Sequence, residues 1–318
     1  MAYEFFGIPL HQYVIRPRSV KICSECLRES PYCRRIWEMS LVTVCPNHLC
    51  LLLDECPRCK KRIHCLRNSV CVCSCDFDWR EYTAPSVDEF GVALSRRIHL
   101  LCGLNVSTDG LLKAEQSPIA GLGLRDLTSA VIFIAGQHQG LSGATGKKFA
   151  RGMSNKVQHA LYTRAYSVFW DWPNNFYEFL DWRRSRESAK FAGQDLSKTG
   201  LCRDFGNFYS GLYRYFSSSE FDFLRAAFGE YLLCRWEGIY VPSVSRWKHS
   251  PRLRGSDRYV SRFEARRLLG VNYKLIDHYI EAGRLDALVR GGGKKRSFLI
   301  EVASLAKLKR QLDQDLSP

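Results

Sequence analysis

Long hydrophobic runs are scarce in this chain of 318 residues. The longest strongly apolar run, "VIFIA" at 131–135, is far too short to cross a bilayer. The first residues, "MAYEFFGIPLHQY", lack the basic stretch and long apolar run of a secretory signal. We therefore expect a cytoplasmic protein, and in a reducing compartment clustered cysteine pairs are more typical of metal sites than of disulfides.

Acidic residues are in short supply, because 32 of them stand against 47 basic residues and give a formal net charge of +15. The hydrophobic fraction of 46% is ample for ordinary cores, which excludes a disordered chain, and the length allows two or three domains. An excess of positive charge favours polyanions. We expect double-stranded DNA as a partner, and no membrane.

Cysteine is rare outside residues 23–75, where eleven of the fourteen cysteines lie. A CxxC or CxxH knuckle lets two side chains reach one tetrahedral ion from a single tight turn, and two knuckles complete the shell. The spacing therefore predicts a first zinc site. Its four ligands are Cys23, Cys26, Cys45 and His48.

A second predicted zinc site begins with Cys56 and Cys59 and needs two of the three cysteines that follow. We choose Cys73 and Cys75, with Cys71 as the substitute. Closed four-ligand shells cannot activate water, and no HExxH or HxE motif accompanies them, so we expect two structural zinc ions and no enzyme. The metals should supply much of the folding energy, since the segment has little room for a core.

Residues 86–255 read mainly as helices. A capping box at Ser86 and Glu89 predicts the start of the first one. The aromatic run "FWDWPNNFYEFLDW" has helical spacing and is more typical of core than of a base-stacking surface. A stretch that looks like a phosphate loop has Leu141 in place of a required glycine and Lys148 in place of Ser or Thr, so we expect no nucleotide site.

The last 62 residues predict a helix–turn–helix followed by a hairpin and a closing helix, a winged DNA-binding arrangement. Ser261 and Glu264 form a capping box for the first helix, and Gly283 ends the second. The segments "LDALV" and "SFLI" predict the hairpin. The side chains predicted to meet DNA are Asn272, Tyr273, Lys274 and His278 on the second helix, and Arg290, Lys294, Lys295 and Arg296 at the hairpin tip.

The segment "KICSECLRESPYCRRIWEMSLVTVCPNHLCLLLDECPRC" resembles the TniQ/TnsD family of transposon target selectors. It shares that family's CxxCL, downstream tryptophan, CxxH, leucine stretch and second CxxC. "CSCDFDW" is similar to the family's closing Cys-x-Cys-Gly, with Asp76 in place of the glycine. "WDWPNNFYEFL", "LRAAFGEYLLCRW" and the excisionase-like C-terminal module also resemble family segments. The resemblance implies zinc roles for Cys23, Cys26, Cys45, His48, Cys56 and Cys59.

The same resemblance implies a bacterial, non-enzymatic adaptor. It would hold attachment-site DNA or an RNA-guided CRISPR complex, and recruit an AAA+ regulator that brings the transposase. We also count a second copy of the chain, in a homodimer, among the candidate partners. Family members carry a helical domain before the zinc segment, whereas 22 residues precede it here. The rival interpretation is a zinc-containing DNA-binding transcription regulator, which recruits no ATPase.

Taken together, these patterns predict a mainly α fold with small zinc-knuckle segments and a C-terminal winged helix–turn–helix. The expected parts are an N-terminal arm (1–22), a tandem zinc-binding module (23–85), a helical TniQ-like domain (86–255) and the winged module (256–318).

Overall fold

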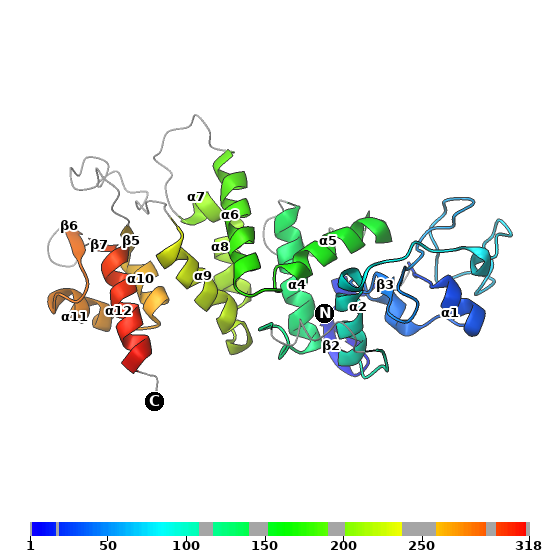
Figure 1. The fold of residues 1–318 in the computed structure, drawn as a ribbon, viewed down its shortest axis with the longest axis horizontal. Helices are drawn as coiled ribbons and strands as arrows, with labels where there is room; N and C mark the ends of the chain where they lie inside the picture. The colour runs from blue at the N-terminus through cyan, green and yellow to red at the C-terminus, as the bar shows by residue number, and fades with distance from the viewer. Residues whose placement is uncertain are drawn as a thin grey trace. The chain divides into compact units, whose positions relative to one another are not determined.

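The computed structural model describes two compact units, residues 1–176 and 177–318, whose elements are labelled in Figure 1. The structure describes residues 2–16, 19–107, 117–139, 152–189, 201–236, 259–290 and 297–315. The fold is mainly helical with small cysteine-rich segments, as the sequence predicts. The finer four-part division stays a prediction. Among the described residues, no helix is long and apolar enough to cross a membrane.

The first unit begins with an antiparallel hairpin whose apolar side chains are buried. Strand β1 (Ala2–Phe5) pairs with β2 (Ile8–His11), and Phe5 and Leu10 are buried in the unit. The cysteine-rich segment follows with little regular structure, as expected for a fold held by metals. Its elements are α1 (Ser24–Glu29), the 3₁₀ turns Arg35–Glu38 and Trp79–Glu81, and the short antiparallel pair β3 (Val44–Cys45) and β4 (Cys50–Leu51).

Helices complete the first unit: α2 (Glu89–Leu101), α4 (Leu124–His138) and α5 (Asn155–Ser167). The predicted capping box at the start of α2 is wrong. Asp88 is the N-cap, and its Oδ1 accepts from the backbone N–H of Gly91 at 2.7 Å. Ser86 instead forms an extended bridge with Cys50, which places it outside the helix. Helix α4 is largely internal, because most of its residues are buried.

Buried polar contacts attach α5 to the cysteine-rich segment. The side-chain amide of Asn155 donates to the carbonyl oxygens of Thr43 and Leu52, both at 2.7 Å. The backbone N–H of Asn155 donates to Asp54 Oδ2 at 2.8 Å, so a distant carboxylate serves the first turn of α5. The cysteine-rich segment therefore shares its interior with a helix more than a hundred residues further along the chain.

The second unit starts within α6 (Asn174–Ala189), and its core is rich in aromatic rings. Tyr177, Phe179 and Leu180 are buried, so the core interpretation of this part of the aromatic run is confirmed. An apolar face made of Phe221, Leu224, Phe228, Tyr231 and Leu232 is likewise buried. The remaining elements here are α7 (Leu201–Phe205), α8 (Asn207–Tyr215), the 3₁₀ turn Ser219–Phe221 and α9 (Asp222–Cys234).

The end of the second unit has two short helices, a hairpin and a closing helix, in the predicted order. They are α10 (Arg262–Leu269), α11 (Tyr273–Glu281), β6 (Ala287–Arg290), β7 (Ser297–Glu301) and α12 (Val302–Asp315). A strand that the sequence did not predict, β5 (Tyr259–Ser261), pairs with β7 and gives an antiparallel sheet in the order β5-β7-β6. Its assignment as a winged DNA-binding module stays a prediction.

The caps of the two short helices, α10 and α11, agree only in part with the sequence-based predictions. Ser261 Oγ accepts from the backbone N–H of Glu264 at 3.2 Å, as predicted. The return half of the capping box is wrong, because the Glu264 carboxylate accepts from the Tyr209 hydroxyl instead. Asn272 caps α11, with Oδ1 accepting from the N–H of Leu275 at 2.9 Å. Gly283, with φ +68°, follows the end of that helix.

Candidate metal centres

The first cluster gathers four side chains from a helix start and a short hairpin. Cys23 is the N-cap of α1 and Cys26 lies in its first turn, where the N–H of Cys26 donates to Cys23 Sγ at 3.5 Å. Cys45 ends β3, and His48 lies in the turn before β4. The ligand atoms of all four residues lie within 4.8 Å of one another.

The spacing of these atoms fits a tetrahedral ion. His48 Nδ1 lies 3.5 Å from Cys23 Sγ, 3.3 Å from Cys26 Sγ and 3.4 Å from Cys45 Sγ. The sulfurs of Cys26 and Cys45 are 3.6 Å apart. A zinc ion at its usual bond lengths requires ligand–ligand edges of about 3.5–3.8 Å. The residues therefore fit a closed Cys₃His site.

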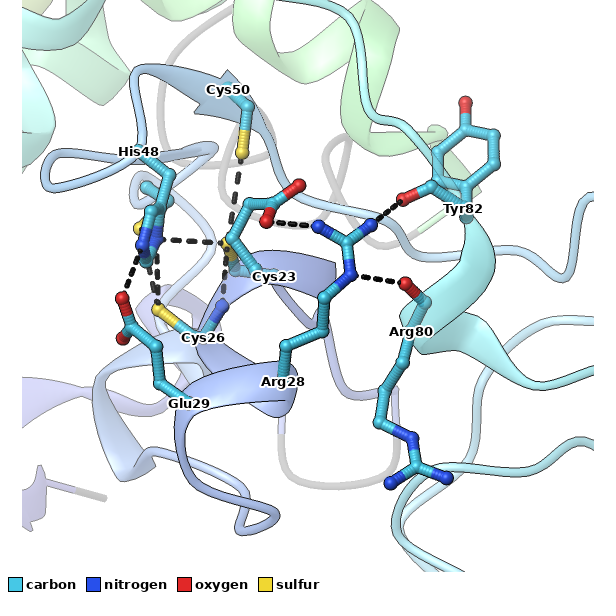
Figure 2. Close-up of polar contacts among 10 residues, drawn as sticks. Cys23, Cys26, Arg28, Glu29, His48, Cys50, Arg80 and Tyr82 are labelled. Atoms are coloured by element: carbon cyan, nitrogen blue, oxygen red, sulfur yellow. Dashed lines mark hydrogen bonds and ion pairs between the residues drawn. The ribbon is translucent and has the colours of Figure 1, made fainter.

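A carboxylate that sequence reasoning missed orients the histidine. Glu29 Oε1 lies 2.8 Å from His48 Nε2, so Nε2–H can donate to it while Nδ1 faces the three sulfurs (Figure 2). Burial lowers the pKa of His48, but the Glu29 hydrogen bond and the Cys23 sulfur outweigh it and raise the pKa overall. A carboxylate on the second ring nitrogen is the usual support of a metal-bound histidine.

A fifth cysteine lies beside the first cluster without belonging to it. Cys50 Sγ is 3.6 Å from Cys23 Sγ, as Figure 2 shows, and its side chain is buried. Its burial is typical of a packing residue. Cys33 and Cys65, by contrast, are exposed.

The second cluster brings together Cys56, Cys59, Cys73 and Cys75. The sulfurs of Cys56 and Cys75 are 3.7 Å apart, and those of Cys59 and Cys73 are also 3.7 Å apart. These edges fit a tetrahedral Cys₄ site. Cys71 is buried outside the group, and its carbonyl accepts from the N–H of Trp79 at 2.9 Å. The pair chosen from the sequence is therefore the one that the fold brings together.

The turn that closes the second cluster explains why Asp76 can stand where the family has glycine. Asp76 has φ +60°, and its N–H donates to the carbonyl of Cys73 at 3.0 Å. This left-handed conformation suits glycine best, and aspartate and asparagine tolerate it better than most other residues. The substitution therefore keeps the turn that brings Cys73 and Cys75 together.

The thiols of the second cluster differ in acidity, because burial and the neighbouring thiols raise the pKa of Cys75 to about 11. Burial raises the pKa of Cys56, but backbone N–H groups of Cys59 and Arg58 donate to its sulfur and bring the pKa down to about 7. A thiol of this acidity is readily present as the thiolate that a metal requires. The thirteen cysteines whose side chains the structure describes are free of disulfides.

A buried lysine fixes the chain between the knuckles. Lys21 is fully buried, and its Nζ donates to the carbonyl oxygens of Met39 at 2.7 Å, Ser40 at 3.3 Å and Val42. Burial lowers the pKa of Lys21 well below its ordinary value. No local pattern marks this residue, because its three partners follow some twenty residues later. It positions the segment that leads to Cys45.

The residues predicted to read DNA lie on one exposed part of α11, as far as the structure describes them. Asn272, Tyr273, Lys274 and His278 are all exposed. Asn272 Oδ1 accepts the hydrogen bond that caps the helix. The same oxygen is therefore not free to read a base. At the hairpin tip, Lys294, Lys295 and Arg296 lie outside the described residues, as does the side chain of Arg290.

These features define a mainly helical protein with two cysteine-rich clusters, each of which could hold a metal ion. The family model described as TniQ matches residues 1–52. The matched segment contains all four residues of the first cluster. The match confirms the resemblance to the TniQ family over this part of the chain and supports a role in transposition target selection. No curated protein matches the sequence.

Proposed function

We propose that this chain is a non-enzymatic adaptor that selects the target site in DNA transposition. The observation that carries the proposal is the TniQ match over residues 1–52, which covers the complete first cluster. The adaptor binds double-stranded DNA at its target and recruits an AAA+ regulator, which brings the transposase. Docking on an RNA-guided CRISPR complex is the other mode of target selection that the family resemblance implies.

Zinc is the metal that we propose for both clusters. Three thiols with one imidazole, and four thiols, are the donor sets of structural zinc sites. Glu29 and Cys50 stand next to the ligands of the first site and hold no place in its shell. Zinc bound there joins segments that have little other structure. The role we assign to the two ions is therefore structural.

DNA reading is assigned to the exposed face of α11. Lys274 and His278 are exposed, whereas Asn272 is engaged in the cap, so the first two are the better readers. Tyr273 lies beneath the guanidinium groups of Arg262 and Arg266, at 4.9 and 5.1 Å from its ring centre. Arg262 is paired with Asp277, so Arg266 is the positive charge beside the start of α11 that we assign to a backbone phosphate.

The test is DNA footprinting with and without the AAA+ ATPase encoded by the same transposon, on DNA from that element's insertion site. We expect protection by the protein alone and an extended footprint when the ATPase is added. His278→Ala should weaken binding to the preferred site by about 1–3 kcal/mol and change binding to random DNA little. Gln314→Ala, an exposed and uncharged change on α12, is the control.

Two results would redirect the proposal. DNA binding without any recruitment of the ATPase would favour the transcription regulator. Absence of DNA binding by the metal-loaded protein would rule out DNA homing and favour docking on a guide complex.

A further inference from the structure

A cationic cavity lies beside the second cluster, and neither the clusters nor the proposed DNA-reading helix uses it. Its volume is about 570 Å³. Lys61, Arg62 and Arg67 line it, against a single carboxylate, Asp76. Arg62 Nε also lies 3.9 Å from Glu55 Oε1, so three positive and two negative groups leave a net charge of +1 with His64 neutral. We call this space the Arg67 cavity.

The charge around the Arg67 cavity exceeds what the cluster itself requires. Between positions 56 and 75 the chain has five basic residues and no acidic residue. A zinc ion with four thiolates carries a charge of about −2. Arg58 donates from Nη1 to the carbonyl of Cys75 at 3.1 Å, so it already lies against the cluster. Two of the five positive charges are enough to offset the thiolates.

The wall formed by Arg67 and Trp79 has hydrogen-bond donors but lacks acceptors. The Arg67 guanidinium lies over the Trp79 ring, 5.2 Å from its centre. Its Nη1 donates to the carbonyl of His64 at 2.8 Å, and its Nη2 to Cys33 Sγ at 2.6 Å. Arg67 Nε–H and Trp79 Nε1–H are both buried, and neither has a partner among the described residues. Buried N–H donors are normally paired, so an acceptor is missing here.

Backbone contacts hold the walls of the cavity in place. The N–H of Val20 donates to the carbonyl of Ile63 at 3.1 Å, and Ser19 bridges to His64. On the other wall, Trp79 is tied to Cys71 by the backbone hydrogen bond already described. The side chains of the cavity therefore stand on a scaffold that the second cluster closes, and a rigid scaffold favours binding because little order is lost.

We propose that the Arg67 cavity binds a backbone phosphate of double-stranded DNA. The charges of Lys61 and Arg67 attract the phosphate, and Lys61 is exposed and without an acidic partner among the described residues. Arg67 Nε–H and Trp79 Nε1–H expose almost no surface, so they donate to a phosphate oxygen only after the two side chains shift. The inference rests on the DNA binding of the proposed function. It adds a contact surface in the first unit, separate from α11.

Duplex binding by the full, metal-loaded chain over a series of salt concentrations tests this. Lys61→Gln should lower the slope of log K against log [salt] by about 0.9, the value for one phosphate contact. Lys60→Gln is the matched control, because Lys60 is exposed one position away and does not line the cavity. Arg67→Lys keeps the charge but loses the stacked fork, so we expect about fivefold weaker binding with the slope nearly unchanged. Two bound metals per chain verify folding of each variant.

Equal effects of Lys60→Gln and Lys61→Gln, with wild-type binding by Arg67→Lys, would overturn the inference in favour of diffuse surface charge. A second measurement follows the Trp79 indole N–H by NMR as inorganic phosphate replaces chloride at constant ionic strength. A shift in the wild type that Arg67→Lys abolishes supports a phosphate site, even if the protein proves to bind no DNA and the proposed function fails. Such a shift with unimpaired duplex binding by Arg67→Lys would assign the cavity to free phosphate and overturn the assignment to DNA.

Discussion

Glu29 shows how much of a metal centre lies outside its ligands. The CxxC and CxxH spacings identify the four ligands because each knuckle is local in sequence. Glu29 follows Cys26 by three positions, and nothing in the sequence marks it as the partner of His48, which comes 19 residues later. The contact depends on how α1 and the turn before β4 come together. Residues that orient ligands are therefore harder to predict than the ligands.

Removing this carboxylate should weaken the first site. Glu29→Ala leaves His48 Nε2 without its acceptor and removes a negative charge from the imidazole. We expect about tenfold weaker metal binding at this site, the low end of the usual range, because the Glu29 side chain is 57% exposed. Competition with a chromophoric chelator measures it, with Glu25→Ala on the same helix as the control. Equal affinity of the two variants would show that the Glu29 contact is dispensable.

At the scale of the element, helix and hairpin order could be predicted well, and boundaries less well. The apolar periodicity of α4, α9 and α12 identifies them without tertiary information. Strand β5 has three residues, which is too short for alternation to mark it, and its pairing with β7 joins positions about 40 apart. Only one of the two hydrogen bonds of the capping box at Ser261 forms. The Glu264 carboxylate instead accepts from Tyr209 on α8, a contact that no local sequence pattern reveals.

The Glu264 contact makes the packing of α8 against α10 sensitive to pH. Burial raises the pKa of Glu264, although the Tyr209 hydroxyl and Arg267 act to lower it. A carboxyl with a raised pKa in the folded state stabilises the fold while it is protonated, and this contribution is lost as pH rises through its folded pKa. At high pH the fold has to hold a buried carboxylate.

Glu264→Gln removes this titration and keeps an oxygen that can accept from Tyr209. From about pH 4 upwards, we therefore expect the free energy of opening in the wild type to fall relative to that of the variant. Hydrogen exchange of the α8 and α10 amides over a pH series measures the difference. Glu281→Gln on the exposed side of α11 is the control. If the free energy of opening changed with pH in the same way in the wild type and in Glu264→Gln, Glu264 would not be the titrating group.

At the scale of the whole molecule, both metal centres lie in the first of two compact units. The sequence predicts that the zinc segment has too little core of its own, but it cannot show where further support comes from. That support includes Arg16, whose Nη1 donates to Gln158 Oε1 at 3.1 Å across 142 residues of chain. Such partners become neighbours only in the complete fold.

Chelation should therefore open the first unit and spare the second. We expect amide protection to be lost over residues 23–82 and over α5, because α5 is held by Thr43, Leu52 and Asp54. The amides of α9 are the internal control. Cys23→Ser or Cys56→Ser should each lower the metal content from about two per chain to about one. Uniform loss of protection across both units, or unchanged metal content in both variants, would contradict this picture.

The attachment of Asn155 also matters for protein engineering. A chimera that exchanges only the cysteine-rich segment between two such proteins would separate Asp54 and the carbonyls of Thr43 and Leu52 from their donors. Each buried group left unpaired costs about 1–3 kcal/mol. The smallest portable cassette therefore has two non-contiguous pieces, the cysteine-rich segment and the first turn of α5, and designers should exchange them together.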